Sequence, residues 1–228
     1  MLHYQLALQS ESFWAAVADS QRTVLQFGRL TDIVLEQLAG LEAQESYERE
    51  IVYPFDALAI VLHGERPDAA EWVERASAEG VNRLEFGLRA YGLHEPLRRG
   101  LPLYVLARPF QWEWVLRELS AEGIDHHNLF RVEKGAEEHL RGHLDRLMGQ
   151  FVRDKVQRPV IVVSDLQYFR ATNLMHGCFA ALCREHGIQP RFLLAPWATA
   201  GHATESVLHA EAAKLALDLE RGLGRWPD

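Results

Sequence analysis

The sequence predicts an α/β protein in which a mostly parallel, Rossmann-like sheet carries helices on both faces. Three observations support this prediction. From residue 56 onward, short apolar runs alternate with longer segments whose apolar residues recur at helical spacing. Buried apolar strands separated by helices are typical of parallel sheets covered on both faces. Most of the helical segments stop at a glycine, which is a common helix end.

The strands and helices can be followed in order along the chain. The predicted strands are residues 56–64, 101–107, 128–132, 159–163 and 191–197. The predicted helices are residues 68–80, 82–92, 111–123, 135–152, 165–187 and 204–224. Leu84, Leu88 and Tyr91 share one side of the second helix, which we expect to be buried. In the fourth helix the corresponding stripe is Leu140, Leu144, Leu147 and Phe151.

Residues 1–52 allow two interpretations. Their apolar residues fall near one helical stripe, and Asp32 would cap the second of two helices. Three short strands and a helix also fit the same stretch. We favour helices, and we predict a helical segment at residues 1–52 that packs on one Rossmann-like domain at residues 53–228.

The composition is that of a globular chain with one sizeable core. It has 228 residues, of which 48% are hydrophobic. The formal net charge of -8 lacks the basic footprint of a nucleic-acid binder. No apolar run approaches the about 20 residues that cross a bilayer, and the first residues lack the pattern of a signal peptide. We expect a cytoplasmic protein that binds neither nucleic acid nor membrane.

Polar or turn-forming residues lie at the carboxyl ends of four of the predicted strands. They are His63-Gly64-Glu65, Ala107-Arg108-Pro109, Ser164-Asp165 and Pro196-Trp197. The carboxyl ends of parallel strands meet at one edge of a sheet, and ligands of such proteins bind beyond that edge. The sequence therefore predicts a small-molecule site at these strand ends.

Ser164 and Asp165 stand between an apolar strand and a helix, and two roles remain open for them. Their side-chain oxygens can cap the helix by accepting from its first N–H groups. Alternatively, the helix N-terminus binds an anion with help from the Ser164 hydroxyl, while Asp165 bonds a ribose or acts as a base. Arg170 pairs with such an anion if it faces the strand ends.

The first strand end offers a second base. His63 titrates near neutrality and suits general-base catalysis, although a loop histidine is often plain surface. Gly64 permits a close approach of the backbone to a ligand, and Glu65 is a candidate ligand-binding carboxylate. Arg108, at the end of the next strand, is a candidate anion ligand.

We predict no metal site. His139 and His143 have the helical spacing of two zinc ligands, but no third ligand is evident, so a solvated helix face is the better interpretation. The two cysteines, Cys178 and Cys183, are expected to be core thiols rather than a disulfide or ligands.

The order of these segments resembles the SanA/YdcF/ElyC-like family of bacterial domains of unknown function. The opening strand "DALAIVLHG" is similar to the first strand of that family, and "RLEFGLRAY", residues 83–91, to its helix R-[IVL]-x-x-[AG]-L-x-L-Y. "LPLYVLARPFQWEW" resembles the family's next strand and helix. Glu113 stands where that helix of the family has a glutamate near its start. "VVSDLQYFRA" resembles the later motif, with Arg170 at the family arginine.

The resemblance implies a Rossmann-like fold with a pocket at the strand ends, and S-adenosylmethionine as a candidate cofactor. Several family features differ here. The glycine-rich loops are lost, the N-T-x-E-N stretch keeps at most Glu138, and the family histidine is replaced by Gln167. A site that depends on those groups is altered in this chain.

Two functional hypotheses follow. In the first, the protein binds a small anionic or nucleotide-like ligand at its strand ends, with group transfer or hydrolysis on a phosphate-bearing substrate as the candidate reaction. In the second, a degenerate, non-catalytic member acts as an interaction or regulatory module, with a homodimer as one candidate assembly. The stretches "QWEWV" and "LLAPWATAGH" would then be exposed contact surfaces.

Overall fold

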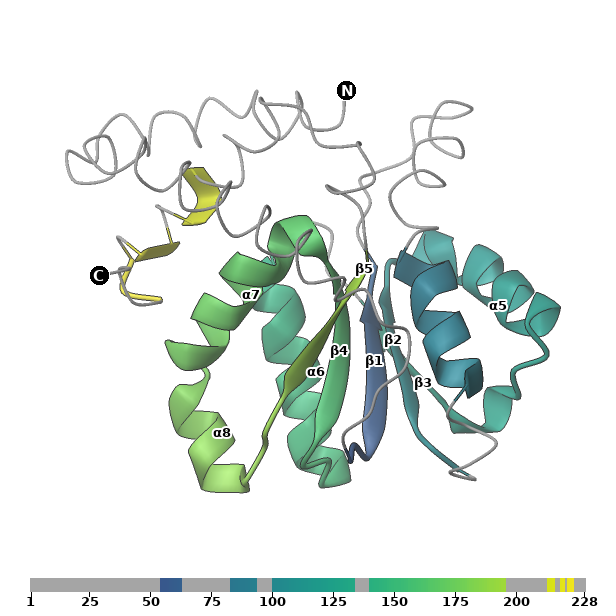
Figure 1. Ribbon diagram of the computed structural model, residues 1–228, viewed down its shortest axis with the longest axis horizontal. Coiled ribbons are helices and arrows are strands. Elements are labelled where there is room, and N and C mark those ends of the chain that lie inside the picture. Colours follow the sequence, from purple (N-terminus) through teal and green to yellow (C-terminus); the bar gives the residue numbers. More distant parts are fainter. Residues whose placement is uncertain are drawn as a thin grey trace. The chain divides into compact units, whose positions relative to one another are not determined.

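The described residues include a five-stranded, all-parallel sheet (Figure 1). Its strands are β1 (Ala57–Val61), β2 (Leu103–Ala107), β3 (Leu129–Glu133), β4 (Pro159–Ser164) and β5 (Arg191–Ala195). They lie in the order β3-β2-β1-β4-β5, and every neighbouring pair is parallel. The predicted fold class, an α/β protein with a Rossmann-like sheet, is confirmed.

The computed structural model describes residues 54–62, 83–93, 100–133, 140–195, 213–215, 218–219 and 221–223. The chain divides into two compact units. The sheet unit comprises Tyr47–Ser164 and Ala181–Ala195, and the second unit comprises Met1–Ser46, Asp165–Ala180 and Pro196–Asp228. The predictions for residues 1–52 and for the helix at 68–80 lie outside the described residues.

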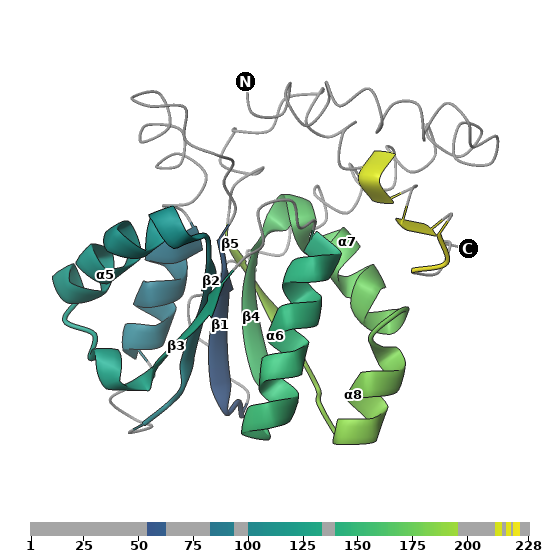
Figure 2. The ribbon, with the colours of Figure 1, turned by 180° about the vertical axis from the view of Figure 1, so that it is seen from behind.

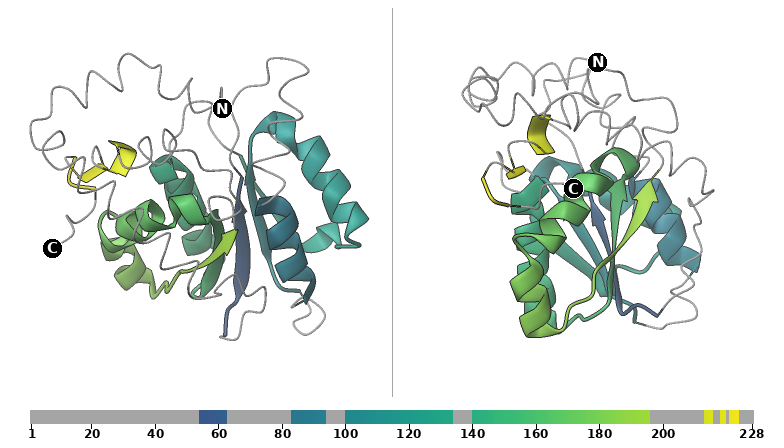
Figure 3. Two further views of the ribbon diagram at one scale, coloured as in Figure 1. Left: turned by 45° about the horizontal axis from the view of Figure 1, so that its top comes forward. Right: turned by 60° about the vertical axis from the view of Figure 1, so that its left-hand side comes forward.

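Helices cover both faces of the sheet within the sheet unit. Residues 83–93 form one helix, and α5 (Trp112–Ala121) and α6 (Leu140–Asp154) follow. Two short 3-10 helices, η2 (Pro109–Gln111) and η3 (His126–Asn128), precede α5 and β3. Helix 83–93 and α5 lie on one side of the sheet and α6 on the other, as Figure 2 and the left panel of Figure 3 show.

The strand order reverses at the centre of the sheet. From β1 the chain continues to β2 and β3 on one side, and it then returns to place β4 and β5 on the other side of β1. The β1–β4 pair is therefore the topological switch point of the sheet. In open α/β sheets a crevice forms beyond the carboxyl ends of the two strands at this point, and ligands bind there.

Helix 83–93 packs unusually close to this central pair because it carries Gly87. A Cβ atom at that position would lie 2.6 Å from Ile60 Cδ1 and 3.4 Å from Val162 Cγ2. The helix backbone therefore rests directly on side chains of both β1 and β4. The predicted apolar face, Leu84, Leu88 and Tyr91, is buried as expected.

The opposite face of the sheet is closed by α6 and an aromatic group around Tyr104. The Tyr104 ring stacks on Phe130 at 4.8 Å between centroids and meets Phe151 edge-on at 5.2 Å. Its hydroxyl donates to Asp154 Oδ2 at 2.8 Å. Burial and this carboxylate raise the pKa of Tyr104 well above its usual range. The predicted stripe of α6 is buried throughout.

The predicted helix at 165–187 is interrupted. The structure has α7 (Asp165–His176) and α8 (Ala180–His186), with a turn between them. Gly177 is a poor helix residue, and the Phe179 N–H donates to Leu174 O at 3.2 Å instead of continuing the helical pattern. Both cysteines are half-buried rather than core residues, because one lies in this turn and the other on the partly exposed α8.

Of the predicted C-terminal helix, residues 213–215 and 218–219 are described, and both pieces are helical. None of the described helices combines the length and the apolar character that a membrane crossing requires.

Candidate functional site

The parallel sheet brings several of the predicted strand ends to one edge. Ser164 of β4 lies opposite Ala195 of β5, and Ala107 of β2 lies opposite Glu133 of β3. Arg108 directly follows Ala107, so Arg108 and Ser164 belong to the same edge, as predicted. The groups His63-Gly64-Glu65 and Pro196-Trp197 lie outside the described residues, as does the side chain of Asp165.

Ser164 has the most informative surroundings at this edge. Its side chain is buried, with 1% of its surface exposed, and Oγ has no hydrogen-bond partner. The hydroxyl therefore does not cap α7, and the capping interpretation is wrong for this residue. A buried hydroxyl without a partner costs about 1–3 kcal/mol, and native proteins rarely keep one unless a bound group satisfies it.

The direction of the Ser164 side chain follows from the strand pattern. Val160 and Val162 belong to the core cluster beneath helix 83–93. Side chains alternate along a strand, so Ser164, two residues after Val162, points to the same face. The hydroxyl thus continues the row of side chains that supports helix 83–93.

Arg83 is the first described residue of helix 83–93, at the same end of the sheet. Its side chain is 1% exposed, and Nη1 donates to the carbonyl oxygen of Val61 at 3.2 Å. Val61 is the last residue of β1. Because Ile60 pairs with Val162, Val61 lies beside the residue that precedes Ser164. Neighbouring strands are about 4.8 Å apart, so a buried cation and a buried hydroxyl occupy the same face of the β1–β4 junction.

Arg83 was not among the predicted ligands, although it is the arginine that begins the family-like helix motif. Its place at the start of this helix motif could have indicated that it lies at the carboxyl edge of the sheet. An arginine that starts an apolar helix over a parallel sheet falls at the carboxyl edge when the helix runs antiparallel to the strands. The Tyr91 hydroxyl, eight residues later, donates to Leu101 O at 2.7 Å near the start of β2, which fixes that direction.

The end of β2 forms a polar turn into α5. The backbone N–H of Arg108 donates to Gln111 Oε1 at 2.9 Å, and Gln111 is fully buried. Trp112, the first residue of α5, is 8% exposed, and its Nε1 has no hydrogen-bond partner. The Arg131 guanidinium lies 5.2 Å over the Trp112 ring. Glu113 is exposed on α5.

Arg170 belongs to the second unit, where it forms an ion pair with Asp218. It is 7% exposed, and its Nε lies 2.5 Å from Asp218 Oδ2, so its charge is neutralised inside that unit. Gln167, at the position of the family histidine, is also buried, and its Oε1 has no hydrogen-bond partner.

Among the described residues no group of three metal-binding side chains comes together. His143 is buried on α6, so the expected solvated helix face is wrong for that residue, which faces the core with Leu144 and Leu147. His139 lies outside the described residues.

Comparison of the chain with protein-family models, with curated proteins and with solved structures finds no significant match.

Proposed function

We propose that the sheet unit binds a small anionic, nucleotide-like ligand at the carboxyl ends of β1 and β4. The observation that carries the proposal is the buried, unpartnered hydroxyl of Ser164 at the switch point of the sheet. A bound ligand that donates to or accepts from Oγ would remove the cost of burying this group.

Arg83 supports an anionic ligand rather than a neutral one. A guanidinium remains charged at any physiological pH and matches phosphate and carboxylate groups geometrically. Burial at the end of β1 places this charge where the dielectric screening of water is weak, so its electrostatic interactions are stronger there than at the surface. The hydroxyl of Ser164 then adds a short, directional bond.

The loop residues His63, Gly64 and Glu65 and the carboxylate of Asp165 remain proposed contacts, with His63 or Asp165 as the base if the ligand is turned over. Membership of the SanA/YdcF-like family, a cytoplasmic location and S-adenosylmethionine as ligand stay proposals on the same footing. They rest on the motifs of the sequence.

The competing hypothesis, an interaction module with exposed tryptophan surfaces, loses part of its support. Trp112 is buried, and Trp114 is half-buried and packs against the core cluster. The stretch "QWEWV" therefore presents no exposed tryptophan patch. The other stretch, around Trp197, lies outside the described residues.

A thermal-shift assay with inorganic phosphate, pyrophosphate, nucleoside phosphates and S-adenosylmethionine tests the proposal. A ligand that binds only the folded state, at a concentration of about 100 times its Kd, stabilises the protein by about 2.7 kcal/mol. We expect at least one of these anions to raise the Tm of the wild type, and Ser164→Ala and Arg83→Lys to reduce that shift. Absence of a shift with every anion, or a full shift in Ser164→Ala, would contradict the proposal.

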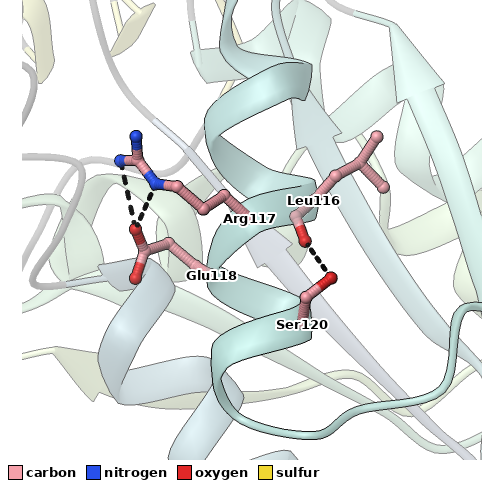
Figure 4. A network of polar contacts seen from close by, with 4 residues as sticks. All are labelled: Leu116, Arg117, Glu118 and Ser120. Atoms are coloured by element: carbon pink, nitrogen blue, oxygen red, sulfur yellow. Dashed lines mark hydrogen bonds and ion pairs between the residues drawn. The ribbon is translucent and has the colours of Figure 1, made fainter.

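The surface of α5 provides matched controls (Figure 4). Ser120 is exposed and its Oγ donates to Leu116 O at 2.9 Å, while Arg117 is exposed and pairs with Glu118 at 3.3 Å. Ser120→Ala and Arg117→Lys make the same chemical changes away from the junction, and both should keep the full ligand shift.

A further inference from the structure

Another buried polar atom without a hydrogen-bond partner lies along the same edge of the sheet, two strands away from Ser164. It is Nε1 of Trp112, the residue with which α5 begins after β2. Trp112 belongs to the core cluster that includes Val162 and Leu84, so it lies on the same face of the sheet as Ser164. The proposed function makes no use of this group.

The indole N–H is a donor and cannot accept, so only an acceptor can satisfy it. Buried tryptophan residues usually find such a partner. The tryptophan ring is held in place by the core beneath it and by Arg131 above it, 5.2 Å from the ring centroid. A rigid, buried donor of this kind suits recognition of a carbonyl, hydroxyl or ring-nitrogen acceptor.

The strand ends that carry the two unsatisfied groups are farther apart than the oxygens of one small oxyanion. Ser164 ends β4, and Trp112 follows β2, with β1 between these strands. Two strand spacings amount to roughly 10 Å. A single phosphate cannot bond both groups, whereas a ligand with an anionic end and a distant acceptor can.

We infer that the ligand is elongated and bipartite, of the nucleoside monophosphate class, with its phosphate at Arg83 and Ser164 and an acceptor of its base or sugar at Trp112 Nε1. The inference rests on the proposed anion site and extends it along the edge to β2. Arg108 follows β2 directly, so its backbone belongs to the same strand end as this second position.

Isothermal titration calorimetry with inorganic phosphate and with the four nucleoside 5′-monophosphates tests the inference. We expect the wild type to bind at least one nucleotide more tightly than phosphate. Trp112→Phe keeps an aromatic ring and removes the donor, so it should weaken that nucleotide about three- to tenfold, the value of one net hydrogen bond. It should leave the phosphate affinity unchanged.

The variants separate failure of this inference from failure of the proposed function. Ser164→Ala should weaken phosphate and nucleotide together, and Trp114→Phe, a matched change on the same helix, should weaken neither. Phosphate binding with no preference for any nucleotide, or an equal loss of both ligands in Trp112→Phe, would overturn the elongated ligand alone. Absence of both phosphate and nucleotide binding in the wild type would overturn the anion site and the elongated ligand with it.

Discussion

The buried hydroxyl of Ser164 is expected to lower the stability of the ligand-free protein. Its hydroxyl is buried without a partner, so replacement by alanine removes an unsatisfied polar group and little volume. We expect Ser164→Ala to raise the free energy of unfolding of the ligand-free protein by about 1 kcal/mol. Urea denaturation monitored by circular dichroism measures the change. A combination of higher stability and weaker binding is the pattern expected of a functional group.

The exposed Ser120 is the control for this prediction. Its hydroxyl already donates to a helix carbonyl in contact with solvent, so Ser120→Ala should change the free energy of unfolding by less than about 0.5 kcal/mol. A loss of stability in Ser164→Ala would show that the hydroxyl is satisfied in solution, and it would remove the main support for the site.

The second prediction at the residue scale concerns a substitution at Gly87. A methyl group there would meet Ile60 at 2.6 Å and would push helix 83–93 away from β1 and β4. We expect Gly87→Ala to destabilise the protein by about 1–3 kcal/mol, the usual cost of overpacking, even though alanine is the better helix former. Thermal or urea unfolding measures this change in the free energy of unfolding.

Gly149 of α6 offers a matched comparison. The nearest atom to an added Cβ there is Arg153 Nη1 at 3.7 Å, which is an ordinary contact. Gly149→Ala should therefore stabilise the protein by about 0.5–1 kcal/mol through helix propensity alone. Equal effects of the two substitutions would mean that helix 83–93 does not pack closely on the central strands.

At the scale of elements, the ion pair between Arg170 and Asp218 joins α7 to the helical residues 218–219. Both side chains are 8% exposed. Removal of one partner from a buried pair leaves an uncompensated charge and costs about 3–5 kcal/mol. We expect Asp218→Leu to destabilise the second unit by this amount, as measured by urea unfolding.

The double variant Arg170→Met with Asp218→Leu should recover most of that loss, because apolar pairs of similar volume replace buried ion pairs without penalty. It also tests the role first predicted for Arg170. If the double variant is stable and still binds the ligand of the wild type, the arginine serves the packing of the second unit. If it is stable and binds nothing, Arg170 is a ligand residue.

At the scale of the whole molecule, the sequence was sufficient to predict the sheet. The apolar runs of β1, β2 and β4 are buried on both faces, so they show the continuous hydrophobic pattern of parallel strands. The strand order is set by long-range pairing and cannot be read from local spacing. The position of the switch point, between β1 and β4, therefore needed the structure.

The candidate site was predictable only in part, for the same reason. Ser164 and Arg108 could be placed at the edge from the sequence, because Ser164 ends β4 and Arg108 directly follows β2. Arg83 reaches that edge from the start of a helix, and whether Arg170 meets a ligand or Asp218 depends on a partner 48 positions away in the chain. Tertiary pairing therefore decides which of several similar arginines lies at the strand ends.

The proposed site makes a prediction for amide hydrogen exchange across the sheet unit. A ligand at the carboxyl edge should slow exchange near the ends of β1, β2 and β4, including the amides of Leu62 and Arg108, because bound ligand suppresses local opening. The start of β4, where the Asp56 carboxylate accepts from the N–H groups of Gln157 and Arg158 at 2.9 and 2.8 Å, should change little. Exchange measured by mass spectrometry with and without a saturating nucleoside monophosphate gives this map. Uniform slowing along the strands would indicate general stabilisation, and slowing confined to the Asp56 end would place the ligand at the opposite edge of the sheet.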